Sequence, residues 1–401
     1  MSTHRFFDDP NAARAFTQRF SGPSTPPNFR IAIVGAGMMG REHLAVSALL
    51  GRAHVVGVLE PHAPSFAEAE RIHDGPTPLR RYENLNAVIE DGELDAIFLC
   101  TPNFTHAELF ESALASGKAL FVEKPMATRL VDAARMVELA QSHGNIVQLG
   151  MQYRFKSQYR ELFHRVKHLD AVGPVKTMSV SEYRPAFLDK VSQWNKFNAN
   201  TGGTLVEKCC HYFDLLNLMA DARPVRVFAT GGRAVNFLDF EYEGRRSDID
   251  DHAFVLIDYV GGIRASFTLN MFSAELYEEM VVTGPKGRLV AREEASFHGR
   301  PSRASLIDDT DVERGARCDE ITYAPTVERS GHHGATLFEH IAFFDALEGK
   351  ATDAATPLEG LWSLIVASAA QESIARSQPV DIDRFVERAL AANPLIKEGH
   401  L

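Results

Sequence analysis

The chain has little of what nucleic-acid-binding and membrane proteins need. Its 401 residues carry 42 Lys and Arg against 53 Asp and Glu, a formal net charge of −11, so they offer no basic excess to phosphate backbones or anionic lipid. No stretch approaches 18 consecutive apolar residues, and the first 28 residues hold no apolar signal segment. We therefore expect a cytoplasmic protein that binds neither nucleic acid nor membrane.

Cysteine is also scarce. Cys100, Cys209, Cys210 and Cys318 are too few and too irregularly spaced for a disulfide framework, and neighbouring cysteines rarely bond each other. We expect all four to be reduced, with the adjacent pair acting as small buried hydrophobes. Two cysteines beside one histidine do not complete a tetrahedral zinc site without distant ligands, so no metal site is predicted.

The length and the 45% hydrophobic content favour two domains. Residues 1–28 are polar and include a Pro/Ser/Gly run, which predicts an N-terminal arm or linker. Residues 29–150 alternate short apolar strands with helices, the pattern of a doubly wound parallel sheet. Residues 151–401 contain longer alternating strands and then helical patterns at 335–348 and 357–376, which predicts an α/β domain with a large, mostly antiparallel open sheet.

A glycine motif, Gly35-Ala36-Gly37-Met38-Met39-Gly40, follows the first predicted strand and opens a helix. This is the context of the dinucleotide fingerprint. Gly35 would allow the tight turn, Gly37 the approach of a pyrophosphate, and Gly40 close packing of helix on strand. The helix beginning at Met38 and Met39 would supply N–H donors with positive dipole character.

The second half of the fingerprint is Glu60, about 20 residues past the third glycine at the end of the second strand. A carboxylate there accepts hydrogen bonds from the adenosine ribose hydroxyls. It would repel a 2′-phosphate, and Pro61-His62 offers no arginine to bind one. The sequence therefore predicts NAD, with NADP less suited, against the alternative of a glycine-rich turn beside an exposed glutamate.

Glu123-Lys124-Pro125 ends the strand predicted at 119–122, at the sheet edge where ligands bind in such folds. Partly desolvated and beside a positively charged nicotinamide, Lys124 would have a lowered pKa. It is a candidate proton donor, proton acceptor or hydroxyl anchor. The alternative is a surface salt bridge beside a turn proline.

Glu207, His211 and Asp214 are spaced i, i+4 and i+7 in a predicted helix that follows Gly202-Gly203. Oxidation of an alcohol needs a base for the hydroxyl proton, and a histidine oriented by a carboxylate suits that task. Either Glu207 or Asp214 could hold the ring tautomer, and Glu207 could also bind substrate hydroxyls. The alternative is a structural histidine.

Together these motifs resemble the Gfo/Idh/MocA oxidoreductase family, which includes inositol, glucose and other sugar dehydrogenases. The resemblance covers nearly the whole chain after Phe29 and also rests on Thr101-Pro102-Asn103 with His106. It implies cofactor contacts from these four residues and from Glu123. It implies that Lys124 and His211 lie beside the nicotinamide and the reacting carbon, and that Glu207, where the family commonly has Asp, binds substrate.

The resemblance further implies a small polyol or sugar-like substrate and pairing of subunits through the open sheet, as a homodimer or homotetramer. Further pocket candidates are Tyr153, Arg154, Tyr183, Arg184, Trp194, Lys196, His332 and His333. Two alternatives stay open beside the NAD-dependent dehydrogenase. One is an enzyme that retains NAD and cleaves a glycoside by transient oxidation, and the other is a catalytically silent NAD-binding sensor.

Overall fold

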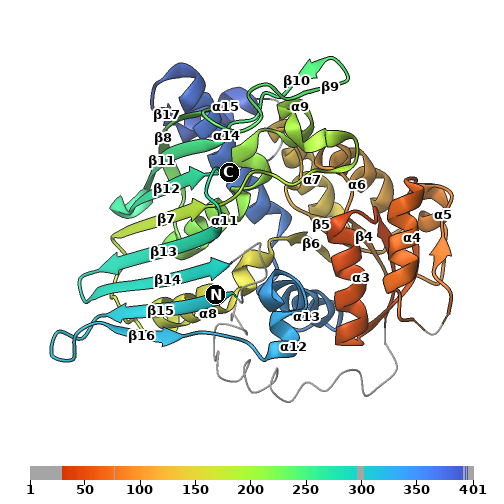
Figure 1. Cartoon of the computed structure of the whole chain (residues 1–401), viewed down its shortest axis with the longest axis horizontal. Coiled ribbons are helices and arrows are strands. Elements are labelled where there is room, and N and C mark those ends of the chain that lie inside the picture. The colour runs from red at the N-terminus through yellow and green to blue at the C-terminus, as the bar shows by residue number, and fades with distance from the viewer. Residues whose placement is uncertain (1–28, 76, 296–301, 392, 394, 396–401) are drawn as a thin grey trace.

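The computed structural model describes residues 29–75, 77–295, 302–391, 393 and 395. Two large sheets lie side by side in it, as Figure 1 shows, with the long strands of the second sheet at the left and the helices α3 and α4 of the first at the right. The strands β9 (Glu241–Tyr242) and β10 (Arg245–Arg246) form a separate small sheet. The α/β fold class is confirmed. The predicted N-terminal arm lies outside the described residues, and the exact domain limits stay a prediction. None of the helices in the described ranges is both long and apolar enough to span a membrane.

The first sheet has six parallel strands in the order β3-β2-β1-β4-β5-β6, the order of a doubly wound dinucleotide-binding sheet. Its central strands are completely buried because helices cover both faces, which is why they are continuous apolar runs. The strands are β1 (Phe29–Val34), β2 (Ala53–Leu59), β3 (Arg80–Arg81), β4 (Ala96–Leu99), β5 (Ala119–Glu123) and β6 (Val147–Gly150).

Helical connections link these strands. Because the strands are parallel, every loop that follows a strand begins at the same edge of the sheet, the carboxyl edge. One of them, after β4, contains the 3₁₀ turn η1 (Asn103–Thr105). The helices are α3 (Met38–Leu50), α4 (Ala63–Ile72), α5 (Leu85–Ile89), α6 (His106–Leu114) and α7 (Leu130–Ser142). The loops after β1, β4 and β5 therefore meet at the carboxyl edge, where the glycine motif, Asn103 and Lys124 lie.

The second sheet has nine strands in the order β16-β15-β14-β13-β7-β12-β11-β8-β17. All neighbours are antiparallel except β7 and β12, so the predicted mostly antiparallel sheet is confirmed. The longer strands are β7 (Thr177–Tyr183), β8 (Pro224–Gly232), β11 (His252–Tyr259), β12 (Arg264–Asn270), β13 (Leu276–Gly284), β14 (Gly287–Ala295) and β15 (Arg303–Asp309). The shorter ones are β16 (Arg317–Glu320) and β17 (Val380–Asp381).

One face of this sheet packs against helices, with α14 against β8 and α8 against β14 and β15. The chain also returns to the first sheet, because α13 packs on α3, α14 packs on α7, and Leu149 of β6 forms a β-bridge with Ala355. The helices and turns are η2 (Gln152–Phe155), α8 (Ser157–Phe163), α9 (Asn198–Thr201), α10 (Thr204–Glu207), α11 (Cys210–Ala220), η6 (His332–Gly334), α13 (Ala335–Leu347), α14 (Pro357–Arg376) and α15 (Ile382–Ala389).

The continuous helix predicted for Glu207, His211 and Asp214 is wrong. Helix α10 ends at Glu207, and α11 begins at Cys210 after a turn at Lys208 and Cys209. The helical spacing of apolar residues continues through the turn, so the pattern alone did not reveal the break. Glu207 therefore projects from the end of one short helix and His211 from the start of the next.

Candidate active site

The glycine motif forms the turn from β1 into α3. Gly35 has φ +93°, and a Cβ there would lie 2.7 Å from the carbonyl oxygen of Cys100, so only glycine fits. A Cβ on Gly40 would meet the carbonyl oxygen of Gly35 at 1.9 Å, whereas one on Gly37 would meet nothing within 4 Å. The turn is closed toward the sheet and open above Gly37, at the N-terminus of a 13-residue helix. This arrangement fits a dinucleotide pyrophosphate.

Glu60 lies at the end of β2 and is tied to the glycine turn. Its Oε2 accepts a hydrogen bond from the Ala36 N–H at 2.7 Å, and its Oε1 accepts one from the His62 N–H at 2.8 Å. A carboxylate has further lone pairs, so it can still accept bonds from ribose hydroxyls. The structure also brings Arg81 of β3 here, where it donates to the Glu60 carbonyl at 3.2 Å and stacks on Phe66. The sequence next to Glu60 did not reveal this arginine.

A buried hydrogen-bond chain holds the carboxylate of Glu123 at the end of β5. His43 of α3 bonds Glu123 Oε1 through Nε2 (2.8 Å) and His340 of α13 through Nδ1 (2.7 Å). Burial favours the protonated acid, but the hydrogen bond from His43 and the charges of His43, Lys124 and His332 together outweigh it and lower the pKa of Glu123. Glu123 therefore supports the loop that carries Lys124 from beneath.

Lys124 joins the two halves of the molecule. Its Nζ donates a 2.9 Å hydrogen bond to the backbone carbonyl of Glu207, and the Glu207 carboxylate accepts a bond from the Asn103 amide. Burial by itself lowers the pKa of Lys124, but the charges of Glu207 and Glu123 outweigh it and the pKa is raised. The protein's own carboxylates therefore act against the lowering expected beside a positively charged nicotinamide, and that lowering stays a prediction.

His211 lies beside this group on α11. Its ring is stacked on the phenol of Tyr153, with centroids 4.1 Å apart and planes within 6°. Nδ1 is buried and has no hydrogen-bond partner among the residues that the structure describes. Burial, followed by the charges of Lys124 and Lys208, holds the pKa of His211 well below its usual range. The imidazole is therefore neutral near pH 7 and able to accept a proton.

Asp214 does not orient His211. Both of its carboxylate oxygens accept hydrogen bonds from the guanidinium of Arg154, at 2.6 and 2.7 Å, and Arg154 also reaches Glu359. Burial of both partners makes this a structural ion pair. The candidate roles of Asp214 as tautomer holder and of Arg154 as substrate ligand are therefore not supported by the geometry.

Two lysines that the motifs did not reveal lie at the same place. Lys208, in the turn between α10 and α11, is buried and donates a 2.6 Å hydrogen bond to Tyr153 Oη. Lys190 reaches over the glycine turn, with Nζ 3.4 Å from Met38 Sδ. Burial lowers the pKa of Lys190 more than Glu207 raises it. Lys208 lies over the Tyr153 ring and Lys190 contacts Met38, and both contacts join residues far apart in the chain, so no motif spacing reveals them.

The remaining pocket candidates separate into two groups. Trp194 packs edge-on against Phe104 of η1, and Arg184 lies 3.7 Å from Glu182, near the site. His332 bonds Glu42 at 2.7 Å, and its ring centroid lies 6.5 Å from that of Tyr153.

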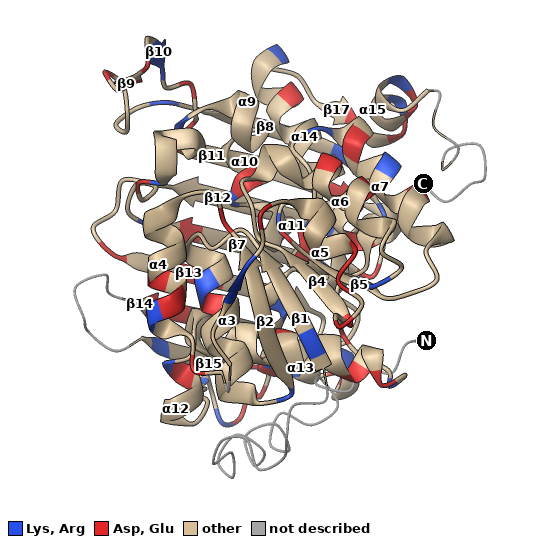
Figure 2. Cartoon of the chain, turned by 90° about the vertical axis from the view of Figure 1, so that its right-hand side faces the viewer, with Lys and Arg blue, Asp and Glu red and all other residues tan. Residues whose placement is uncertain are grey.

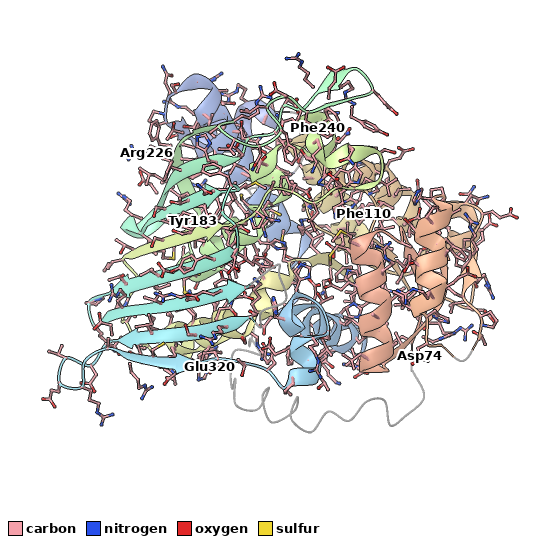
Figure 3. The ribbon with its side chains drawn as sticks, in the orientation of Figure 1. Asp74, Phe110, Tyr183, Arg226, Phe240 and Glu320 are labelled. Atoms are coloured by element: carbon pink, nitrogen blue, oxygen red, sulfur yellow. The ribbon has the colours of Figure 1, made fainter. Side chains whose placement is uncertain are left out.

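Three other candidates lie away from His211. Tyr183, labelled in Figure 3, is exposed on β7 and contacts Tyr277, on the face opposite the buried Glu182. Lys196 is buried and binds the carbonyls of Phe187 and Leu188, so it holds the loop before Lys190. His333 points to Glu293 at 3.4 Å.

The Thr-Pro-Asn segment lies after β4, next to the glycine turn. A Cβ on Gly35 would lie 3.0 Å from the Thr101 side chain. His106 is fully buried, and its ring nitrogens Nε2 and Nδ1 lie 2.9 and 2.8 Å from the carbonyl oxygens of Thr101 and Pro125, one of which accepts the N–H of the neutral ring. It therefore links the loops after β4 and β5, a supporting position beneath the predicted cofactor contacts of Thr101, Pro102 and Asn103.

Figure 2 shows charged residues of both signs interspersed on the side of the molecule that carries α3 and α4. Within the described ranges no group of three or more His, Cys, Asp and Glu side chains is placed to hold a metal ion.

Comparison with known proteins gives relatives along nearly the whole chain. A myo-inositol 2-dehydrogenase of Thermotoga maritima is 24% identical over 363 residues, 89% of this chain and 99% of the relative. A scyllo-inositol 2-dehydrogenase (NAD(+)) of Bacillus subtilis is 24% identical over 362 residues, 90% of this chain and 97% of the relative. The fold resembles a solved levoglucosan dehydrogenase in complex with NADH and levoglucosan, with a TM-score of 0.74, 19% identity, and coverage of 88% and 99%.

Two family models match the chain. The model described as an oxidoreductase family with an NAD-binding Rossmann fold matches residues 29–151. The model of the C-terminal alpha/beta domain of the same family matches residues 169–382. With its two sheets, its glycine turn and these matches, the chain belongs to the Gfo/Idh/MocA family of oxidoreductases.

Proposed function

We propose that the protein is an NAD-dependent dehydrogenase that interconverts a secondary alcohol and a ketone on a cyclitol, sugar or sugar derivative. The observation that carries this proposal is the convergence of Lys124, Glu207 and His211 beside the glycine turn. A proton acceptor, a cation and a hydrogen-bonding carboxylate are what alcohol oxidation requires next to a hydride acceptor. The names of the inositol and levoglucosan relatives support a cyclic polyol.

The roles follow from the state of each group. Bound NAD supplies the acceptor for the hydride. His211 is neutral and takes the hydroxyl proton, while the ammonium of Lys124 donates a hydrogen bond to the same oxygen and stabilises negative charge that develops there. Glu207, fixed by Asn103, accepts bonds from neighbouring hydroxyls. In the reverse direction His211 returns the proton.

NAD is proposed over NADP because of Glu60. Its carboxylate is anchored at the glycine turn by two backbone N–H groups, where it would face a 2′-phosphate with like charge. Among the described residues, Arg81 is the one cation that donates a hydrogen bond to Glu60. It is engaged with the Glu60 carbonyl and the Phe66 ring rather than free to clamp a phosphate.

A homo-oligomer formed through the nine-stranded sheet is also proposed. The face of this sheet away from the helices exposes large apolar side chains on adjacent strands, and Leu256 of β11 pairs directly with Phe228 of β8. Phe254 and Leu256 are each 55% exposed. A contiguous apolar area of this kind is typical of subunit interfaces.

The test of function is NADH absorbance on mixing the protein with NAD and a panel of inositols, aldoses, alditols, sugar acids and glycosides, with NADP in parallel. NADH formation with a cyclic polyol supports the proposal. Glycoside consumption with retained NAD and no net NADH would replace it with the transient-oxidation reaction. Ligand binding without any turnover would replace it with a sensor.

A further inference from the structure

Three buried carboxylates form a row across the inner face of the second sheet. Glu182 on β7 pairs in register with Glu278 on β13, which pairs with Glu293 on β14. All three are at most 1% exposed. Buried carboxylates on neighbouring strands repel each other unless cations compensate them, and two lysines do so here.

Each lysine compensates a different part of the row. Lys156 bonds Glu278 at 2.6 Å and Glu293 at 2.8 Å, and its charge lowers the pKa of Glu293 to about 2 against the effect of burial. Lys208 forms the ion pair with Glu182, at 3.1 Å. Lys208 is thus fixed by the sheet although it lies in the turn just before His211.

The ammonium of Lys208 bridges from the sheet to the ring that supports His211. Besides Glu182 it binds Tyr153 Oη at 2.6 Å, and that phenol ring is stacked on the imidazole. Within the described residues no other side-chain contact orients His211, because Asp214 is bound to Arg154 and Nδ1 has no partner. The stacked ring is therefore the support that holds the imidazole in place.

We propose that Lys208 is a positioning residue for His211, because its ammonium, paired with Glu182, holds the Tyr153 ring on which the imidazole is stacked. The same positive charge, buried beside the imidazole, disfavours protonation of His211 and so keeps it a base. This inference rests on the proposed function, in which His211 is the base.

Other charged groups also act on His211, and the test must separate Lys208 from them. These groups are Lys124 after β5, Lys156 just before α8 and His332 on η6; the neutral phenol of Tyr153 acts through its stacked ring. Removal of Lys208 alone would also leave Glu182 without its closest cation, which destabilises a buried site. The test variant therefore neutralises both partners, as Lys208→Met with Glu182→Gln.

The first readout is the protonation of His211 itself, which requires no substrate. Ring signals of the ¹³C-histidine-labelled protein are followed by NMR against pH, and the signal lost in His211→Ala identifies His211. We expect the double variant to protonate at higher pH than the parent protein. Tyr153→Phe, which retains the stacked ring and the lysine charge, should leave this titration unmoved, as should the control Lys118→Met, whose Nζ binds the distant Ile89 carbonyl.

The second readout is turnover with the polyol that gives NADH. Loss of the Lys208 contact should lower kcat about 10- to 100-fold in both the double variant and Tyr153→Phe, with KM for NAD unchanged. The acid limb of the rate profile should move to higher pH in the double variant alone. A folded double variant with the parent titration and the parent kcat overturns the inference. Full turnover in His211→Ala would instead overturn the proposed role of His211.

Discussion

The Nζ of Lys124 lies 2.9 Å from the backbone carbonyl oxygen of Glu207, to which it donates a hydrogen bond across 83 residues of sequence. Lys124 follows a strand of the first sheet, and Glu207 ends a helix that packs against the second part of the molecule. The candidate site is therefore assembled only when both parts are folded and docked. Substitutions in either part of the folded protein can therefore test the site.

Replacement of His211 by Ala removes the proposed base. Turnover with the polyol substrate should fall by about 10²- to 10⁴-fold, because general base catalysis contributes that much. Binding of NADH, followed by fluorescence titration, should change little since the glycine turn is untouched. The control His143→Ala, at a half-buried histidine whose ring bonds the Lys118 carbonyl, should keep parental turnover. Parental turnover in His211→Ala would exclude the residue from the mechanism.

Replacement of Glu60 by Gln removes the charge that faces the adenosine ribose. We expect KM for NAD to rise about 10-fold, since a hydrogen bond to a charged group contributes on the order of 1.5–3 kcal/mol. The ratio of kcat/KM for NADP to that for NAD should rise as well, because the repulsion of a 2′-phosphate is gone. Steady-state kinetics with both cofactors measures this, with the exposed Glu83→Gln as control. An unaltered ratio would mean that Glu60 does not select the cofactor.

Glu339 should make the protein less stable as pH rises. Both of its carboxylate oxygens are buried without a partner in the described residues, and burial, with the charge of Glu123, holds its pKa well above the usual range. Between the unfolded pKa and this raised value only the folded state keeps the proton, so stability falls by about 1.4 kcal/mol per pH unit. Below the pKa of Glu339 in the unfolded chain, both states are protonated and this loss of stability is absent.

Glu339→Gln cannot ionise and should therefore gain stability over the parent protein as pH increases from about 4.5, the region of an ordinary glutamate. Urea unfolding at a series of pH values measures the difference, with Glu387→Gln on the surface of α15 as control. A difference that is the same at every pH would contradict the raised pKa of Glu339.

A charge on the open face of the second sheet should dissociate the proposed oligomer. Phe254→Asp places a carboxylate among Phe228, Leu256 and their counterparts on a second copy, where it would be desolvated. Light scattering after size exclusion should show a smaller particle with unchanged circular dichroism. Val312→Asp, at a loop position that is 99% exposed, is the matched control. An unchanged mass for Phe254→Asp would exclude this face as the interface.

The sequence was sufficient for five of the six strands of the first sheet because their signals are local. The edge strand β3 and helix α4 were not predicted. A buried strand, a glycine turn and an amphipathic helix each follow from neighbouring residues, and helix 357–376 was predicted at its observed limits for the same reason, with Pro357 at its start. The motifs also brought Lys124, Glu207 and His211 into one hypothesis, and the structure places them together.

What the sequence did not reveal depends on partners far along the chain. Asp214 has the spacing of a residue that orients His211, but it forms an ion pair with Arg154, which lies 60 residues earlier in the chain. Glu182 and Tyr183 are neighbours in sequence, but the pleat of β7 sends one to the buried face and the other to the open face. The spacing of residues within one helix or strand does not reveal a distant partner such as Arg154, nor which face of a strand is buried.

The core of the first sheet also determines when the chain can finish folding during synthesis. Ile31, Phe98 and Phe121 of its strands pack in one cluster with Phe338 and Phe343 of α13, and these two phenylalanines are translated more than 200 residues after the strands. The nascent N-terminal half consequently leaves the ribosome with an apolar surface that only the C-terminal half can cover. Chaperone protection should therefore be needed until α13 has emerged, and a ribosome stalled before that point should hold an aggregation-prone intermediate.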